Sequence, residues 1–155
     1  MNLLAKSKQV FHTYGALSGN DEYLNSAIIY SFGIDDDGKI WIGTEDGGIN
    51  IYNPNTGKYQ YLLADNQNKN SISQNCIKAF LNDGRGNLWV GTFLGGVDVI
   101  DLGTQKVTNF SHDPDDYNSI SDNKVWDFAM DGNGDVWIAT SKGVDKFIRV
   151  ENRFE

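Results

Sequence analysis

The side chains that could perform catalysis or bind a metal are few and scattered along this sequence. His12 and His112 are its histidines, and Cys76 is its single cysteine. A zinc site needs several such ligands close together, and a general base needs a positioned partner. The histidines have no further histidine or cysteine near them, and Cys76 lies in an apolar-leaning segment typical of a packed thiol. We therefore expect no catalytic residues, no metal and no cofactor.

Two acidic turns have the composition of calcium-binding loops. They run from Asp35 to Gly38 and from Asp131 to Gly134. An EF-hand loop carries a bidentate glutamate six residues after its glycine, but this position holds Thr44 in the first turn and Thr140 in the second. The spacing favours hairpin turns instead, in which glycine adopts a positive φ and the first aspartate accepts hydrogen bonds from the turn amides.

These turns belong to a repeat of about 48 residues, since Trp41, Trp89 and Trp137 are 48 residues apart. The segments around them align without a gap and read DDDGKIWIGT (35–44), DGRGNLWVGT (83–92) and DGNGDVWIAT (131–140). The motif NSIS occurs at 70–73 and again at 118–121. Self-similarity at such a period indicates an array of stacked supersecondary units.

Each repeat has the pattern of four short strands separated by glycine-rich turns. The strands expected in the middle copy are 76–82, 87–92, 97–101 and 106–110. Four antiparallel strands in 40–50 residues make one blade of a β-propeller. The sequence therefore predicts an all-β fold in which residues 1–155 form one propeller segment. Its expected parts are the fourth strand of a blade at about 8–14 and three blades at about 24–71, 72–119 and 120–155.

The W-(I/V)-G-T motif, its acidic glycine turn, the following G-G pair and NSIS together resemble the two-component regulator propeller repeat. That repeat builds the extracellular sensor region of hybrid two-component system proteins in Bacteroides-type bacteria. The resemblance covers about residues 10–150 and implies a periplasmic sensor, often for glycans, that belongs to a membrane-anchored protein. The third copy departs from the pattern, with Ala139 in place of glycine and one glycine missing after Lys142.

Charge and composition argue against several classes of partner. The net charge is −8, and the 13 basic residues are scattered instead of forming a stripe. Nucleic acids and anionic membrane surfaces both require clustered lysine and arginine. The sequence also lacks an apolar run of the roughly 18 residues that a membrane span requires. We therefore expect no nucleic-acid partner and no direct membrane contact from this chain.

The best candidates for ligand binding lie in the connections between blades, at 15–26, 63–74 and 111–122. These connections are rich in Asn, Asp, Ser and Tyr, which suit sugar hydroxyls, and they should share one rim of the propeller. Because NSIS recurs, we interpret it as structural and place binding specificity in the variable tips. The candidate residues there are Asn20, Asp21, Tyr23, Asn66, Asn68, Asp115 and Tyr117.

The tryptophans divide into two groups. The tryptophan of the W-(I/V)-G-T motif recurs in every copy among apolar residues, which indicates packing between blades. Trp126 differs, because its counterparts in the other copies are Tyr30 and Lys78. A residue that departs from its repeat is a better functional candidate, so Trp126 joins the predicted ligand-binding residues.

Functions from two classes fit these features. The first is a non-catalytic sensing segment with an oligosaccharide ligand, and the second is a purely structural scaffold for protein–protein assembly. An enzyme of the propeller lyase type would require a histidine and an acid clustered on one rim. This cluster is not evident in the sequence.

Three blades are too few to close a propeller, which normally has about 4–8. The segment from Val10 to Tyr14 matches a fourth strand, whereas the third copy ends at Phe154 as its own fourth strand begins. One expectation is therefore a head-to-tail homodimer with six blades, in which the N-terminal strand completes the partner's last sheet. The other is a segment of a larger propeller.

Overall fold

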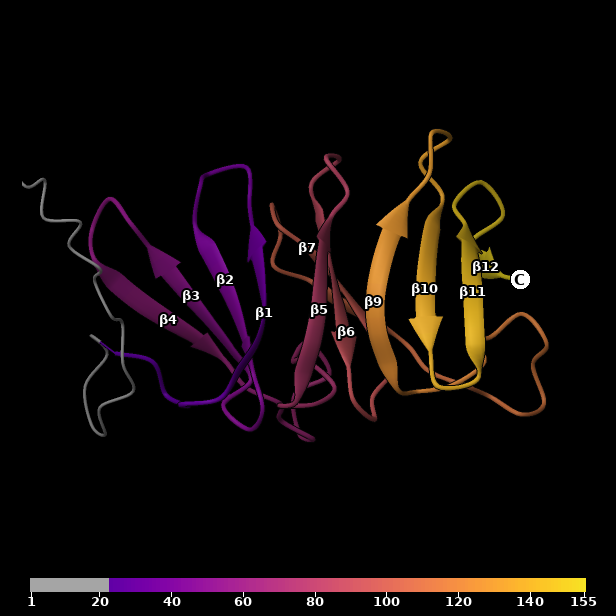
Figure 1. Ribbon diagram of the computed structural model, residues 1–155, viewed down its shortest axis with the longest axis horizontal. Helices are drawn as coiled ribbons and strands as arrows, with labels where there is room; N and C mark the ends of the chain where they lie inside the picture. The colour runs from indigo at the N-terminus through magenta and orange to yellow at the C-terminus, as the bar shows by residue number, and fades with distance from the viewer. Residues whose placement is uncertain (1–22) are drawn as a thin grey trace, which may run out of the picture.

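The computed structural model describes residues 23–155. In this range twelve strands form three antiparallel four-stranded sheets, which stack side by side in chain order (Figure 1). The predicted all-β fold of propeller blades is thus confirmed. The strand expected at about 8–14 lies outside the described residues.

In each sheet the strands are adjacent in the order in which they follow one another along the chain. The first sheet contains β1 (Ile29–Ile34), β2 (Ile40–Thr44), β3 (Ile49–Asn53) and β4 (Lys58–Leu62). The second contains β5 (Ile77–Asn82), β6 (Asn87–Thr92), β7 (Val97–Asp101) and β8 (Val107–Phe110). The third contains β9 (Val125–Met130), β10 (Val136–Thr140), β11 (Gly143–Ile148) and β12 (Arg153–Phe154).

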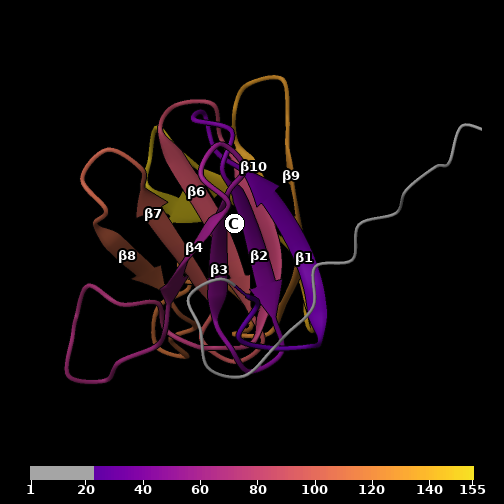
Figure 2. The ribbon, with the colours of Figure 1, turned by 90° about the vertical axis from the view of Figure 1, so that its left-hand side faces the viewer.

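The sheets contact one another through their first strands, β1 against β5 and β5 against β9. They fan out from this edge, with β4 and β8 at the opposite edge (Figure 2). In a propeller the first strands of the blades surround the central axis, so β1, β5 and β9 form the axial edge of this segment. The first strands begin at the lower end of the molecule in Figure 1, where the connections between blades also run.

Two tryptophans of the repeated motif are packed as expected. Trp41 lies in an apolar cluster with Ile77 and Leu88 of the second blade, and Trp89 lies in a second cluster with Val125 and residues of the third blade. Both side chains are buried. Each blade therefore covers one face of the next.

The glycine of the W-(I/V)-G-T motif allows this close stacking. A Cβ added at Gly43 would lie 2.8 Å from Cγ2 of Ile77, and one added at Gly91 would lie 2.7 Å from Cγ1 of Val125. Carbon atoms do not approach so closely without displacing the neighbouring strand. The third copy has Ala139 at this position, on a sheet face that no described blade covers.

Trp137 corrects the expectation that every copy packs its tryptophan. Its side chain is 42% exposed, because no described blade covers this face of the third sheet. Lys146 is its cross-strand neighbour on this face. The equivalent positions on β3 and β7 hold the apolar residues Ile51 and Val99. At this position the open face of the third blade therefore carries a lysine where the two packed faces carry apolar residues.

The structural interpretation of NSIS is confirmed. In the second blade the backbone N–H and the hydroxyl of Ser73 both donate to Oδ2 of Asp98, at 2.8 and 2.9 Å. In the third blade Ser121 donates in the same way to Asp145. The serine therefore fastens the connection to the third strand of the blade that it enters.

Asp98, the second residue of β7, is fully buried. Burial raises the pKa of the Asp98 carboxyl, although hydrogen bonds from Ser73 and Asn109 oppose this shift. A carboxyl with a higher pKa in the folded state binds protons preferentially there. Its favourable contribution to stability is complete below the unfolded pKa of about 3.9 and is lost as pH rises through the folded pKa.

We therefore expect the unfolding free energy of the wild type to fall relative to that of Asp98→Asn as pH rises from about 3.5 to 7. Asparagine fits the position sterically, since Asn50 occupies it in the first blade. The control is Asp101→Asn, because hydrogen bonds from Thr104 lower the pKa of Asp101 and reverse the sign. Urea denaturation across this pH range measures both differences. A difference for Asp98→Asn that is independent of pH would contradict the assignment.

Candidate functional site

The predicted residues at the connection tips lie at the outer edge of the blades. In the first described connection, the Asn70 side chain donates to the carbonyl of Gln105 and accepts from the N–H of Val107, where β8 begins. In the next connection the carbonyl of Asn118 accepts from the N–H of Phe154 in β12. Each connection therefore passes beside the fourth strand of the blade that it enters.

The candidates at these tips, Asn66, Asn68, Asp115 and Tyr117, are exposed, and Tyr117 is 98% exposed. Tyr23 is half-buried, and its carbonyl accepts a hydrogen bond from the Tyr61 hydroxyl at 2.6 Å. Asn20 and Asp21 lie outside the described residues. Trp126 lies on β9, at the axial edge. The structure therefore separates Trp126 from the connection tips.

Trp126 belongs to a cluster that unites all three blades. Tyr30, Lys78 and Trp126 are the second residues of β1, β5 and β9, so they lie on neighbouring strands. The Lys78 amine lies 3.3 Å from the centroid of the Tyr30 ring and 5.9 Å from that of Trp126. An ammonium over an aromatic face is attracted by the ring quadrupole. We call Tyr30, Lys78, Trp126 and the nearby Phe93 the axial aromatic cluster.

The turns between the second and third strands complete this cluster. Phe93 meets the Trp126 ring edge-on, with 5.8 Å between centroids. The Tyr30 hydroxyl donates to Oε1 of Glu45 at 2.9 Å, and Nε1 of Trp126 donates to Oγ of Ser141 at 3.1 Å. The Tyr30 and Trp126 side chains remain about half exposed. The arrangement therefore offers aromatic surface next to polar groups.

Sequence reasoning named Trp126 as a candidate but did not name the residues that the structure places beside it. A signal for them was present, because Tyr30, Lys78 and Trp126 share one repeat position at which the three copies disagree. The position after the motif threonine disagrees as well and holds Glu45, Phe93 and Ser141. These two variable repeat positions thus supply all four residues of the cluster.

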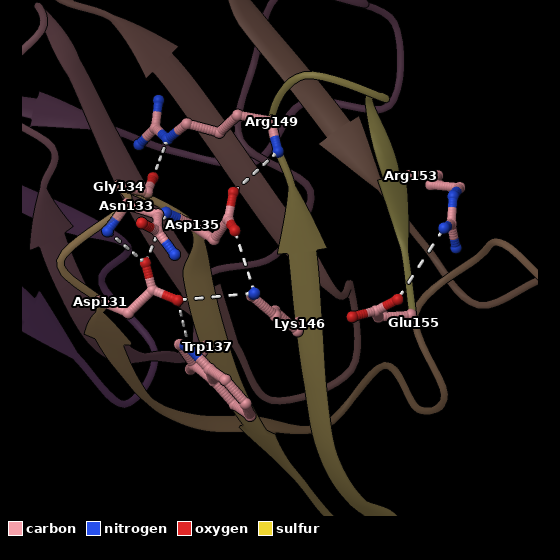
Figure 3. Close-up of polar contacts among 9 residues, drawn as sticks. All are labelled: Asp131, Asn133, Gly134, Asp135, Trp137, Lys146, Arg149, Arg153 and Glu155. Carbon is pink, nitrogen blue, oxygen red and sulfur yellow. Dashed lines mark hydrogen bonds and ion pairs between the residues drawn. The ribbon is translucent and has the colours of Figure 1, made fainter.

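The acidic turns are hairpins, as expected. Oδ1 of Asp131 accepts from the amides of Asn133 and Asp135, and Oδ2 accepts from Nε1 of Trp137 (Figure 3). The Trp137 indole and these amides hold the pKa of Asp131 below its ordinary value. Asp35 is bonded in the same way to its turn and to Trp41. The carboxylate oxygens therefore hold the turn and the tryptophan together.

The acidic turn of the second blade, which contains Asp83, contacts the third blade. Oδ2 of Asp83 pairs with Nη1 of Arg149 at 2.9 Å, and both side chains are largely buried. Nε of Arg149 also donates to the carbonyl of Gly134 (Figure 3). The guanidinium group lies over the Trp89 ring. Arg149 therefore joins the second and third blades at the rim opposite the axial aromatic cluster.

Hollows lie outside the axial aromatic cluster as well, and two of them are the larger ones. One of about 430 Å³ separates the first and second blades at their outer edge, and Tyr61, Asn68 and Gln105 are among its lining residues. The other, of about 310 Å³, lies on the apolar face of the first blade beside Phe32 and Tyr59. The tip candidate Asn68 thus lines the hollow between the first and second blades.

Sequence and structure comparisons identify the fold. The sequence profile of the two component regulator propeller matches residues 23–46, 71–93 and 119–142. Among curated proteins, none is significantly similar in sequence.

In residues 23–155, no helix is long and apolar enough to cross a membrane.

Solved structures share the arrangement of the blades. The extracellular domain of the hybrid two component system BT3049 from B. thetaiotaomicron superposes with a TM-score of 0.76 at 19% identity, over 84% of this chain and 18% of that one. The extracellular domain of BT4673 from the same organism gives 0.72 at 24% identity, over 90% and 20%. This chain therefore spans about a fifth of the length of those domains.

A propeller enzyme is similar as well. Virginiamycin B lyase from Staphylococcus aureus superposes with a TM-score of 0.60 at 17% identity, over 82% of this chain and 40% of the lyase. At identities this low, each of these likenesses establishes the fold alone.

Proposed function

Because this chain is built from two-component regulator propeller repeats, we propose that it is a ligand-sensing segment of the extracytoplasmic part of a two-component signalling protein. In this proposal the parent protein is anchored in a membrane and the segment lies in the periplasm. The extracellular domains of BT3049 and BT4673 support this location. The segment is non-catalytic and holds an oligosaccharide on the axial aromatic cluster.

The observation that carries the proposal is the convergence of Tyr30, Lys78, Phe93 and Trp126 at one end of the axial edge. Exposed aromatic faces suit the apolar faces of sugar rings, and a few placed polar groups give orientation. Glu45 and Ser141 lie within hydrogen-bond distance of cluster residues and can also bond to sugar hydroxyls. Tyr30, Lys78 and Trp126 share one repeat position, so each blade adds an aromatic ring or a cation to the same surface.

The chemistry of the rim supports a non-catalytic role. Nδ1 of His112 lies 2.8 Å from the carbonyl oxygen of Ile120, in the connection between the second and third blades. His112 is therefore engaged in holding its own connection. The described residues include no group of three His, Cys, Asp or Glu side chains that could hold a metal ion.

Replacement of Trp126 by alanine should weaken the binding of a saccharide identified on a glycan array by about tenfold or more, because the aromatic surface is lost. The control is Tyr117→Ala, which removes an exposed aromatic residue from a connection tip. Calorimetry measures both affinities. If Tyr117→Ala weakens binding and Trp126→Ala does not, the ligand is bound by the connection tips that the sequence analysis favoured. If no glycan binds at all, the scaffold function is favoured instead.

We further propose that the isolated chain forms a head-to-tail homodimer. The first blade exposes Phe32 and Ile34, and the third blade exposes Trp137 and Val144. The corresponding faces pack together inside the chain, where Trp89 contacts the third blade. The exposed apolar residues at both ends favour a second copy as the cover.

Light scattering tests this assembly, and the expected mass is about twice the 17.3 kDa of one chain. The free edge of the third sheet is short, because β12 already pairs with Phe147 and Ile148 of β11 and Glu155 exchanges backbone hydrogen bonds with Lys146. A strand from the partner can therefore extend the sheet only alongside the rest of β11. A stable monomer, or a series of ill-defined oligomers, would refute the dimer and favour a segment of a larger propeller.

A further inference from the structure

We propose that the ligand of the axial aromatic cluster is an acidic saccharide, whose anionic group is bound by Lys78 and Lys124. This inference rests on the proposed function and assigns its ligand class. Lys78 lies on β5, and Lys124 directly precedes β9. Both amines face the same ring, at 5.3 Å and 5.7 Å from the centroid of Phe93.

These lysines differ from the other partly buried cations among residues 23–155, all of which form ion pairs. The partly buried Lys39 and Lys146 form ion pairs with aspartates, and so does Arg149. Lys78 and Lys124 are also partly buried, but neither forms an ion pair with a described residue. A lysine ammonium that is fully buried is ordinarily paired with an acid, whereas a partly buried lysine can pack its stem and keep its charged head accessible. Here the two ammonium groups lie over aromatic rings.

The nearby acids Glu45 and Asp122 form no ion pair with either lysine. The Glu45 carboxylate accepts from the Tyr30 hydroxyl, and Oδ1 of Asp122 accepts from the backbone N–H of Lys124. The whole chain carries a net charge of −8. Two ammonium groups that form no ion pair with a described residue therefore lie around one ring of an acidic protein, and an anion close to both would be attracted by each of them.

The positions of the two lysines and of Trp126 also indicate which kind of ligand carries the anionic group. Each ammonium has three donors, and a ring face satisfies none of them as fully as an oxygen anion does. The half-exposed face of Trp126 lies beside this site and suits a sugar ring. Binding of a nucleic acid would require a longer track of cations. A carboxylated or sulfated saccharide matches both the charge and the aromatic surface.

The test is calorimetric titration of the purified chain with three probes. Trigalacturonate carries carboxylates, its methyl ester is neutral, and a κ-carrageenan oligosaccharide carries sulfates without carboxylates. We expect at least one anionic probe to bind, and the ester to bind at least about tenfold more weakly than trigalacturonate if the group is a carboxylate. Binding of carrageenan alone would identify the group as a sulfate.

Substitutions of the two lysines test whether Lys78 and Lys124 bind the anionic group. Lys78→Gln and Lys124→Gln should each weaken binding of the anionic probe by about tenfold or more. Lys106→Gln, an exposed lysine on the outer edge, removes the same charge and should leave the affinity unchanged. Melting temperatures close to that of the wild type exclude misfolding as the cause.

Three results would overturn the inference: the ester binds as tightly as trigalacturonate, neither anionic probe binds, or the two lysine variants retain full affinity. The proposed function fails by a different result. If a neutral glycan binds and loses affinity on Trp126→Ala, the saccharide site stands and only its preference for an anion is wrong. If no saccharide of either kind depends on Trp126, both proposals fail.

Discussion

Trp89→Ala should lower the free energy of unfolding by about 3–5 kcal/mol, because it opens a cavity between the second and third blades. The side chain is 2% exposed. Its ring lies within 5.1–6.4 Å of the centroids of Phe110, Phe128 and Phe147. These rings come from different blades, so collapse of the cavity would require the blades to move together. Urea denaturation monitored by circular dichroism measures the loss.

Trp137→Ala is the matched control, because Trp137 occupies the same repeat position on an open face. We expect the free energy of unfolding of this variant to fall by about 1 kcal/mol or less at low protein concentration, since little buried volume is removed. Equal losses in the two variants would mean that Trp137 is also covered, as in the proposed homodimer. A loss under about 1 kcal/mol for Trp89→Ala would contradict the packing assignment.

Gly91→Ala should destabilise the chain by about 1–3 kcal/mol, since the added methyl group overpacks the contact between blades. The new Cβ would lie 2.7 Å from Cγ1 of Val125 and 3.1 Å from Cε2 of Phe128. Both atoms belong to the inner strand of the third blade, which cannot retreat without opening the axial edge. The midpoint of urea denaturation measures this effect.

The reverse change, Ala139→Gly, tests the same position without a following blade. It should cost about 0.5–1 kcal/mol through backbone entropy alone. The two substitutions together separate the intrinsic preference of the strand for alanine from the steric effect of the neighbouring blade. If Gly91→Ala leaves the free energy of unfolding unchanged or raises it, the blades are not held as close together as the structure indicates.

The sequence by itself determined the blades. Local chemistry defines each one, because an acidic glycine turn, a W-(I/V)-G-T strand and a G-G turn follow one another within a few residues. The expected strands at 87–92 and 97–101 coincide with β6 and β7. The serine of NSIS binds the third strand only 25 residues later, at Asp98. Contacts between residues this close in the sequence recur in every copy of the repeat, so the period of 48 residues was enough to predict them.

The tertiary structure decided what the repeats do together. Tyr30, Lys78 and Trp126 are 48 residues apart and meet because the first strands of successive blades lie side by side. The connection tips lie at the outer edge instead, because each must reach the fourth strand of the blade that it enters. The pattern of one repeat describes the inside of a blade and contains no information about which positions converge in the stack. The angle and spacing between sheets set that convergence, and they arise from packing around residues such as Trp89 and Gly91.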